Sequence, residues 1–139
     1  FLPHEDFSIS ATMLDYRRLG KQRVEALQIY NVLVDNPTLQ GKRYKGWRNH
    51  PAVLMWDGYV EALLLYKNKM IEEWIARGFN NNMDIVGLPD SIKMPPWLGD
   101  NRVHASHRSN LLRKDLEYYY SRYKWKEPID MDYYWPIEK

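Results

Sequence analysis

Helical periodicity between residues 9 and 34 constrains the fold of this chain more than any other feature. Apolar residues recur there three and four positions apart, as in a helix with a buried side: Ile9, Met13, Tyr16, Val24, Leu27 and Val34. Polar residues stand at i, i+3, i+7 and i+10 on another face: Asp15, Arg18, Gln22 and Glu25. Ser8 or Ser10 can cap this helix, which should end near Val34, before Asn36-Pro37. The pattern predicts one long helix that packs on one side and presents charge on another.

Gly20 stands in the middle of this predicted helix, where glycine costs about 1 kcal/mol relative to alanine. Its presence predicts that a backbone or a ligand approaches the helix closely at this point. The polar stripe that begins at Asp15 has two interpretations that periodicity does not separate. It is either a functional surface or a solvated face with ion pairs at helical spacing.

A second helix is expected from His50-Pro51, where the proline fits the first turn, to the stop signal Arg77-Gly78. Its broad apolar coverage marks it as the central core helix, interrupted by a kink or a close crossing at Asp57-Gly58. The segment 79–101 is rich in Asn, Gly and Pro and predicts a loop, with room for one helical turn at 83–86.

A third helix is expected to begin near His104 or Ser106 and to reach Tyr119 or beyond. The tail 123–139 contains two Trp, three Tyr and two Pro, which favours aromatic strapping across the core over a disordered end. We therefore expect an all-α fold: one compact domain over residues 1–139, with three main helices, long loops and an aromatic C-terminal strap.

Composition excludes several classes of function. The chain has no cysteine, which excludes a disulfide framework, a thiolate nucleophile and the common cysteine-containing zinc sites. No apolar run approaches the ~20 residues of a membrane span, and no signal peptide is visible, so a cytoplasmic protein without a membrane partner is expected. No glycine-rich phosphate loop and no nucleophile elbow occur, so nucleotide hydrolysis and serine hydrolysis are poorly supported.

The formal net charge is only +2, but the basic residues gather in two segments. The first lies between residues 15 and 48, where Lys42 to Arg48 interleaves positive charge with aromatic rings, and the second lies between residues 102 and 114. Two basic segments that meet in the fold would form a phosphate-binding surface. His104 and His107 have the spacing of a helical metal pair, but the neighbouring Arg and Lys favour an anion, so no metal and no cofactor are expected. Scattered solvated charge and structural histidines are the alternatives.

Four blocks of this sequence together resemble one family. They are Leu19 to Ala26 (LGKQRVEA), Trp47 to Ala52 (WRNHPA) followed by Met55-Trp56, Glu73-Trp74 with Arg77-Gly78-Phe79, and His104 to Lys114 (HASHRSNLLRK). In this order they resemble the pyrimidine-dimer DNA glycosylases, also called dimer-specific endonuclease V, and above all the bacterial and phage branch. The resemblance to the well-understood phage enzymes is weaker and mainly one of layout.

The resemblance implies a small, metal-independent, all-α enzyme of DNA repair that acts on double-stranded DNA. It implies that the enzyme excises UV-induced pyrimidine dimers and then nicks the abasic strand. The nucleophile would be the amine of the processed N-terminus, and a glutamate on the first helix would assist the reaction. A monomer on a duplex that is bent, with a base expelled from the stack, is expected.

Two positions depart from the family pattern. When Tyr16-Arg17 is matched to the corresponding pair of the phage enzymes, Arg18 takes the place of the catalytic glutamate. Glu25, the glutamate of the same stripe, is therefore the candidate carboxylate, with Asp15 in reserve. Members of this branch also begin a few residues earlier, so the α-amine of Phe1 is the candidate nucleophile only if Phe1 is the true first residue.

The resemblance and the charge pattern together nominate residues that contact DNA. They are Arg17, Arg18, Lys21, Gln22, Arg23, Arg48, His104, His107, Arg108, Arg113 and Lys114. Three other functions remain open at this point: a glycosylase for another modified base, a non-catalytic nucleic-acid-binding module, and a nucleotide-processing enzyme that grips a phosphate.

Overall fold

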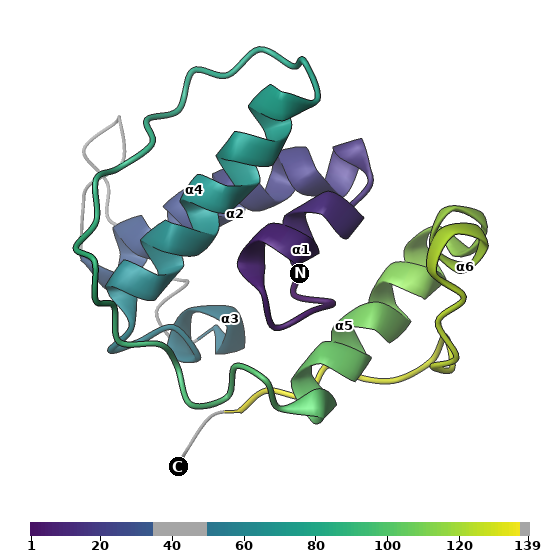
Figure 1. The fold of residues 1–139 in the computed structure, drawn as a ribbon. Helices are drawn as coiled ribbons and strands as arrows, with labels where there is room; N and C mark the ends of the chain where they lie inside the picture. The colour runs from purple at the N-terminus through teal and green to yellow at the C-terminus, as the bar shows by residue number, and fades with distance from the viewer. Residues whose placement is uncertain (35–49, 137–139) are drawn as a thin grey trace.

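The computed structural model describes residues 1–34 and 50–136, and these contain six α-helices and no strand. The helices are α1 (Phe7–Met13), α2 (Tyr16–Leu33), α3 (Pro51–Leu54), α4 (Val60–Ala76), α5 (Asn101–Lys114) and α6 (Leu116–Tyr123). The all-α prediction is confirmed (Figure 1). The three long helices expected from periodicity are each divided into two. The connector that carries Lys42 to Arg48 lies outside the described residues.

The first predicted helix divides at Leu14-Asp15, where Leu14 is extended, with φ −74° and ψ 141°. Asp15 caps α2 by accepting a hydrogen bond from the backbone N–H of Arg18, and Asp6 caps α1 in the same way from Ile9. Leu14 itself is fully buried, so the apolar pattern continues through the break and conceals it. Asp15 therefore begins α2 and is not an internal member of its polar stripe.

The other two predicted helices divide for similar local reasons. Gly58 has φ +86°, which glycine adopts without strain, and separates α3 from α4. Asp115, with φ −154°, ends α5 and caps α6 through the backbone N–H of Tyr118. The predicted stop at Arg77-Gly78 is confirmed, with Gly78 at φ +89°. No helical turn forms at 83–86.

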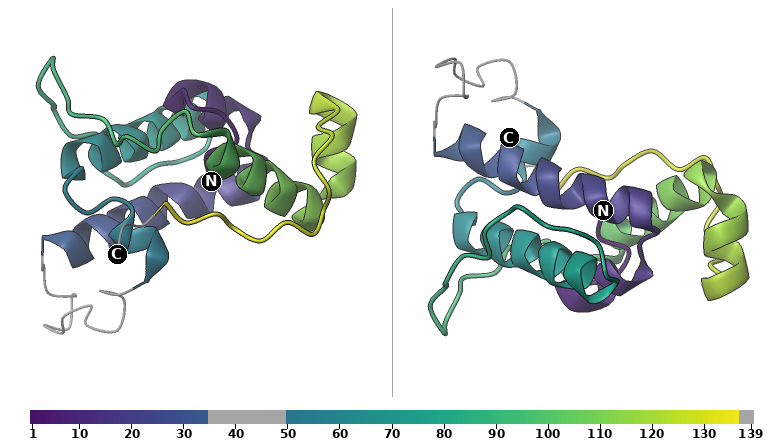
Figure 2. Two further views of the ribbon diagram at one scale, coloured as in Figure 1. Left: turned by 90° about the horizontal axis from the view of Figure 1, so that it is seen from below. Right: turned by 90° about the horizontal axis from the view of Figure 1, so that it is seen from above.

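The helices surround the first residues of the chain. Helices α2 and α4 lie side by side, α1 packs on α4, and α5 leads to α6 on the opposite side (Figure 1). The first residue, Phe1, lies in the middle of the molecule in all three views (Figures 1 and 2). One hydrophobic cluster includes residues of this opening segment together with residues of all six helices, among them Leu2, Leu19, Leu63, Leu111 and Tyr119.

The C-terminal strap, which we define as residues 124–136, returns across this core. Trp125 stacks on Tyr119 with 5.4 Å between ring centroids, and Tyr134 and Trp135 pack against the hydrophobic cluster. Ser109 of α5 fixes the strap by donating to the carbonyl of Pro128. The expectation of aromatic strapping is confirmed for these residues.

Candidate functional site

The second basic segment holds the first residues of the chain in place. The backbone N–H of Leu2 donates to Nδ1 of His107 at 2.8 Å, and Nδ1 of His104 is 2.8 Å from the carbonyl oxygen of Leu2. Arg108 donates to the carbonyl of Pro3 at 2.9 Å. These three side chains of α5 therefore position the opening segment, a role that their sequence pattern did not reveal.

Two further helices hold the α-amine of Phe1. The amine donates to Oε1 of Gln22 on α2 at 2.5 Å and to the hydroxyl of Tyr66 on α4 at 2.9 Å. The Tyr66 hydroxyl is itself 2.8 Å from the Phe1 carbonyl oxygen and 2.9 Å from Oε1 of Gln22. The amine therefore has a fixed position. The two residues that set it, Gln22 and Tyr66, are separated from Phe1 by 21 and 65 positions in the sequence.

Burial changes the ionisation of this amine. Removal from water lowers the pKa of the Phe1 α-amine from 8.0 to about 5, while the nearby negative charge of Glu25 raises it and opposes part of the fall. A buried amine with this pKa is neutral at pH 7 and carries a free electron pair. Burial and Glu25 also raise the pKa of the Tyr66 phenol well above its usual value.

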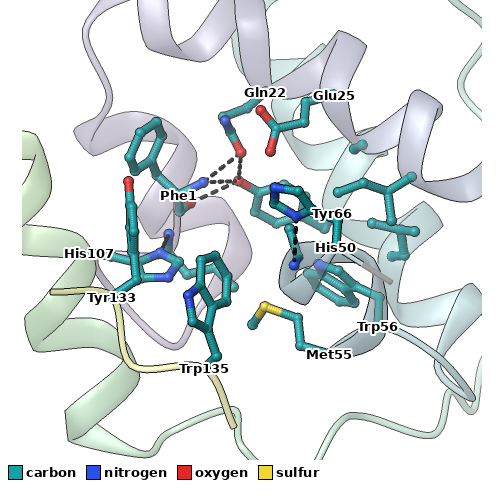
Figure 3. Close-up of a pocket in the computed structure, with 15 residues that line it drawn as sticks. Phe1, Gln22, Glu25, His50, Met55, Trp56, Tyr66, His107, Tyr133 and Trp135 are labelled. Atoms are coloured by element: carbon teal, nitrogen blue, oxygen red, sulfur yellow. Dashed lines mark hydrogen bonds between the residues drawn. The ribbon is translucent and has the colours of Figure 1, made fainter. Parts of the chain in front are cut away.

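A cavity of about 470 Å³ opens beside the amine (Figure 3). Its polar lining comes from Gln22, Glu25, His50, Tyr66 and His107. Its remaining walls are apolar or aromatic: Phe1, Leu2, Ala26, Ile29, Ala52, Met55, Trp56, Leu63, Tyr133 and Trp135. An apolar pocket with a few convergent polar groups is typical of small-ligand and catalytic sites.

Glu25 lies at the edge of this cavity, one turn beyond Gln22 on α2, and its carboxylate points toward the group around the Phe1 amine (Figure 3). It makes no hydrogen bond and no ion pair within the part of the chain that the structure describes. It also lines a second, more open groove, with Tyr16, Arg17, Lys21 and Trp74. The candidate carboxylate therefore stands between a half-open cavity and a more open basic groove.

Asp15, the reserve carboxylate, occupies a different environment. It is 5% exposed, caps α2 and accepts a hydrogen bond from the hydroxyl of Tyr119, and it does not line the cavity. Burial and this hydrogen bond raise the pKa of Tyr119. The contacts of Asp15 are those of a residue that stabilises the fold.

The predicted DNA contacts fall into two groups. Four are exposed: Arg17 and Lys21 on α2, and Arg113 and Lys114 at the end of α5. Lys114 lies close to the site, with its ammonium 5.9 Å from the centroid of the Phe1 ring. Arg48 lies outside the described residues. A part in DNA binding stays a prediction for all five.

The remaining nominated side chains are engaged within the protein. Gln22 and the two histidines are buried, Arg18 pairs with Asp15 at 3.4 Å, and Arg108 pairs with Glu127 at 3.1 Å. Arg23 lies over the ring of Trp74 at 4.4 Å and donates to Asn81 at 2.9 Å. For these residues too a DNA contact stays a prediction, and each also has a structural role.

The close approach predicted at Gly20 is found, and the approaching group is a side chain. A Cβ on Gly20 would lie 3.0 Å from Cζ3 of Trp74. Phe79 stacks on Trp74 with 4.4 Å between centroids, and Tyr16 lies 6.1 Å from Phe79. Gly20 therefore allows an aromatic group to pack against the outer face of α2.

Sequence reasoning missed several cavity residues. Tyr66 lies within the predicted core helix but was not singled out there, and Tyr133 and Trp135 were expected only as strapping. The high aromatic content was the available signal, but it does not say which rings line a cavity. Within residues 1–34 and 50–136 no group of three or more His, Cys, Asp or Glu is arranged to hold a metal ion, and no helix there is long and apolar enough to cross a bilayer.

Comparison with known proteins gives a family. The model of the pyrimidine dimer DNA glycosylase family matches residues 1–86, which include Phe1, Gln22, Glu25 and Tyr66 but not α5. No curated protein and no solved structure matches the chain. Because the match covers more than half of the chain and includes the residues that hold the Phe1 amine, the protein belongs to the pyrimidine dimer DNA glycosylase family.

Proposed function

We propose that this DNA glycosylase releases its base by attack of the Phe1 α-amine on C1′ of the nucleotide, and that it then cleaves the abasic strand as a lyase. One observation carries the proposal: the amine lies in a mostly apolar cavity, next to a carboxylate that has no partner among the described residues. The lowered pKa of the amine supports it, since only the neutral form is nucleophilic.

The proposed steps use the Phe1 amine, the substrate and proton exchange with solvent. The nitrogen forms a bond to C1′ as the glycosidic bond breaks, and the base leaves with the bonding electrons and takes a proton from solvent. The nitrogen then loses one proton to solvent, and its second proton is transferred to O4′ as the C1′–O4′ bond opens, which leaves an imine between protein and sugar. The imine makes the C2′ proton acidic, and its loss expels the 3′ phosphate and nicks the strand.

Glu25 is the residue proposed to assist these steps. Positive charge develops on the sugar and then on the imine nitrogen, and a fixed carboxylate at the cavity edge stabilises both. Gln22 and Tyr66 hold the amine with its electron pair available to the substrate. The proposal applies to a protein whose first residue is Phe1, because any preceding residue would convert this amine into an amide.

The exposed basic groove is the proposed path of the DNA backbone. Arg17 and Lys21 line it, and Glu25 connects it to the cavity. Lys114 on α5 stands near Phe1, with its ammonium 5.9 Å from the ring centroid. Positive groups from two helices near the cavity favour a phosphate backbone that passes close to it.

Borohydride trapping tests the proposal. The protein, with Phe1 verified as its first residue by intact mass, is incubated with borohydride and either a UV-irradiated duplex or a duplex that contains an abasic site. We expect a covalent adduct with both, and peptide mapping should place it on Phe1. A matched protein with one glycine before Phe1 should form the adduct much more slowly, although it still binds DNA.

The outcomes separate the possible functions. An adduct with abasic DNA alone would support the lyase and move the glycosylase to another base, which a panel of lesion duplexes identifies. DNA binding without any adduct would refute the imine mechanism and favour a binding module. An adduct that maps to a lysine would keep the chemistry and remove Phe1 from it.

A further inference from the structure

Two histidines of α5 hold the backbone of Leu2, and their hydrogen bonds require opposite tautomers. His107 accepts the N–H of Leu2 at Nδ1, at 2.8 Å, so a neutral ring carries its proton on Nε2. His104 accepts the N–H of Gly99 at Nε2, at 2.9 Å, so its proton stands on Nδ1, which is 2.8 Å from the carbonyl oxygen of Leu2. The N–H and the C=O of Leu2 therefore each have one histidine partner.

These contacts require that both rings are neutral. A second proton, on Nδ1 of His107, would face the N–H of Leu2, and one on Nε2 of His104 would face the N–H of Gly99. Burial lowers the pKa of both histidines, which agrees with neutral rings. We call this pair, His104 and His107, the histidine clamp.

The clamp acts one residue away from the Phe1 amine. The N–H that His107 accepts belongs to the peptide bond between Phe1 and Leu2, and the imidazole lines the cavity beside the amine (Figure 3). The Phe1 ring lies edge-on to this imidazole, with 6.3 Å between centroids and 81° between planes. Arg108 holds the carbonyl of Pro3 at 2.9 Å. With Leu2 and Pro3 held, mainly rotations within Phe1 itself remain to move the amine.

We propose that His104 and His107 are positioning residues of the reaction: they hold the Leu2 backbone so that the Phe1 amine stays out of water with a free electron pair. The inference deepens the proposed function, because it assigns how the nucleophile of that function is kept neutral. An α-amine in water is largely protonated at pH 7, whereas removal from water lowers the pKa of this amine to about 5. The two rings act through Leu2 and transfer no proton.

The charged group nearest in effect works against a neutral amine. Glu25 raises the pKa of the amine, and it is the only carboxylate among the described residues that line the cavity. The other titratable or charged groups around the amine and the clamp are His50, Tyr66, Lys114 and Tyr133, with His4, Glu5 and Arg108 beside His104. Exclusion of water is therefore the main cause of the neutral amine, and the clamp is the device that maintains it.

Paired substitutions test the clamp. Asparagine keeps the contact with Leu2 at either position, since its Oδ1 or Nδ2 atom can take the place of Nδ1, whereas leucine has a similar size and removes the contact. The four variants are His107→Asn, His107→Leu, His104→Asn and His104→Leu. Both His104 variants also lose the acceptor for Gly99, so their comparison isolates the contact with Leu2.

Asn110→Leu is the matched control on the same helix. Asn110 is 1% exposed, and its side chain bonds to Ser106, Met131 and Arg113. Its replacement removes buried polar contacts of α5 and leaves the hydrogen bonds of Leu2 in place. Thermal unfolding of every variant first establishes that it is folded at the assay temperature.

The readout is the pH profile of single-turnover cleavage of abasic DNA at saturating protein. In the parent protein, the asparagine variants and the control, the rate should rise with pH through about 5. In the leucine variants the midpoint should move to about 7, so that the rate falls roughly 10-fold at pH 6 and recovers at about pH 9. Recovery at high pH separates the loss of a neutral amine from the loss of the fold.

Several outcomes would overturn the inference and leave the proposed function intact. They are an unchanged midpoint in both leucine variants, and a rate that is lower at every pH without recovery. An equal shift in the asparagine variants or in Asn110→Leu would also overturn it, because the contact with Leu2 would then not be the cause. A parent protein that cleaves no abasic DNA at any pH would refute the proposed function, and the role of the clamp in it.

A second measurement needs no variant and no DNA. Nitrogen-15 NMR of the parent protein should show the Phe1 amine titrating near pH 5. At pH 7 it should show the imidazole proton on Nδ1 in His104 and on Nε2 in His107. An amine that titrates near 8, or either ring in the other tautomer, would overturn the inference even if a leucine variant does not fold.

Discussion

At the scale of single residues, Asp15 and Glu25 show how environment separates two acids of one predicted stripe. Asp15 is enclosed by the first turn of α2 and by Tyr119, and its oxygens already accept hydrogen bonds. Glu25 lies ten residues further on, at the cavity, without a partner among the described residues. Only a carboxylate of the second kind is free to respond to charge that develops on a substrate. The two acids should therefore give opposite results when they are replaced.

Glu25→Gln is expected to slow imine trapping on abasic DNA by roughly 100-fold or more, because it removes the charge that stabilises the imine. The affinity for DNA should change little. Glu72→Gln is a suitable control, since Glu72 is a partly exposed acid that pairs with Lys69 at 3.2 Å and does not line the cavity. Normal trapping by the Glu25 variant would remove this residue from the mechanism.

Asp15→Ala is expected to lower the free energy of unfolding by about 2–4 kcal/mol, from loss of a helix cap and of the partner of the Tyr119 hydroxyl. Urea unfolding measures this change. The variant Asp6→Ala removes only the cap of α1 and should cost about 1 kcal/mol. Below its unfolding temperature the Asp15 variant should retain activity, and a fully folded but inactive protein would return Asp15 to the list of catalytic candidates.

At the scale of elements, the faces of the helices could be predicted, and so could the stop at Arg77-Gly78, but two of the breaks within the predicted helices could not. Periodicity found the buried side of α2 and the apolar coverage of α4, because burial repeats every three to four residues. It did not find the breaks at Leu14 and Asp115, because the apolar pattern runs through both. Aspartate at a helix start was the available signal, since Asp6, Asp15, Asp100 and Asp115 all act as caps.

Gly20→Ala tests the packing of α2 against Trp74. Alanine gains about 1 kcal/mol of helix propensity, but its Cβ would lie 3.0 Å from a ring held by Asn80, Phe79 and Arg23. Overpacking typically costs about 1–3 kcal/mol, so we expect a net loss of about 1 kcal/mol in urea unfolding. Gly87→Ala is the control, with no atom within 4 Å of the added methyl group. A more stable Gly20 variant would show that Trp74 yields easily.

At the scale of the whole molecule, the opening segment joins three helices that do not share one neighbourhood in sequence. Its amine contacts α2 and α4, and its next two residues contact α5. The cavity forms where these helices, the turn after α3 and the C-terminal strap meet. The ionisation of the amine is a property of this assembly, and the proposed path of the DNA depends on it.

The pH dependence of the reaction should report the buried amine. Its pKa is lowered to about 5, and the protonated form is not nucleophilic, so the rate should rise with pH through about 5 and stay level from about 6 to 8. The measurement is single-turnover cleavage of abasic DNA at saturating protein and constant ionic strength. A rise centred near pH 8, the ordinary value for an α-amine, would show that the amine is exposed to water in the reacting complex.

Salt dependence should locate the DNA surface. Lys21→Ala and Lys114→Ala are each expected to weaken binding and to reduce the slope of log K against log salt by about 1, because each removes one phosphate contact. Lys69→Ala should leave the slope unchanged, since Lys69 already pairs with Glu72. Equal slopes in all three variants would place the DNA on another face.

The sequence by itself determined the helical faces, the close contact at Gly20 and the richness in aromatic residues, because each follows from local spacing or composition. The tertiary structure alone decided how the polar residues are used. His107 meets Leu2 across 105 residues, and Tyr66 meets Phe1 across 65. Local patterns contain no information on such contacts. For this reason the histidines and Arg108, which read as phosphate ligands in the sequence, hold the start of the chain in the fold, while Glu25 lies at the cavity without a partner among the described residues.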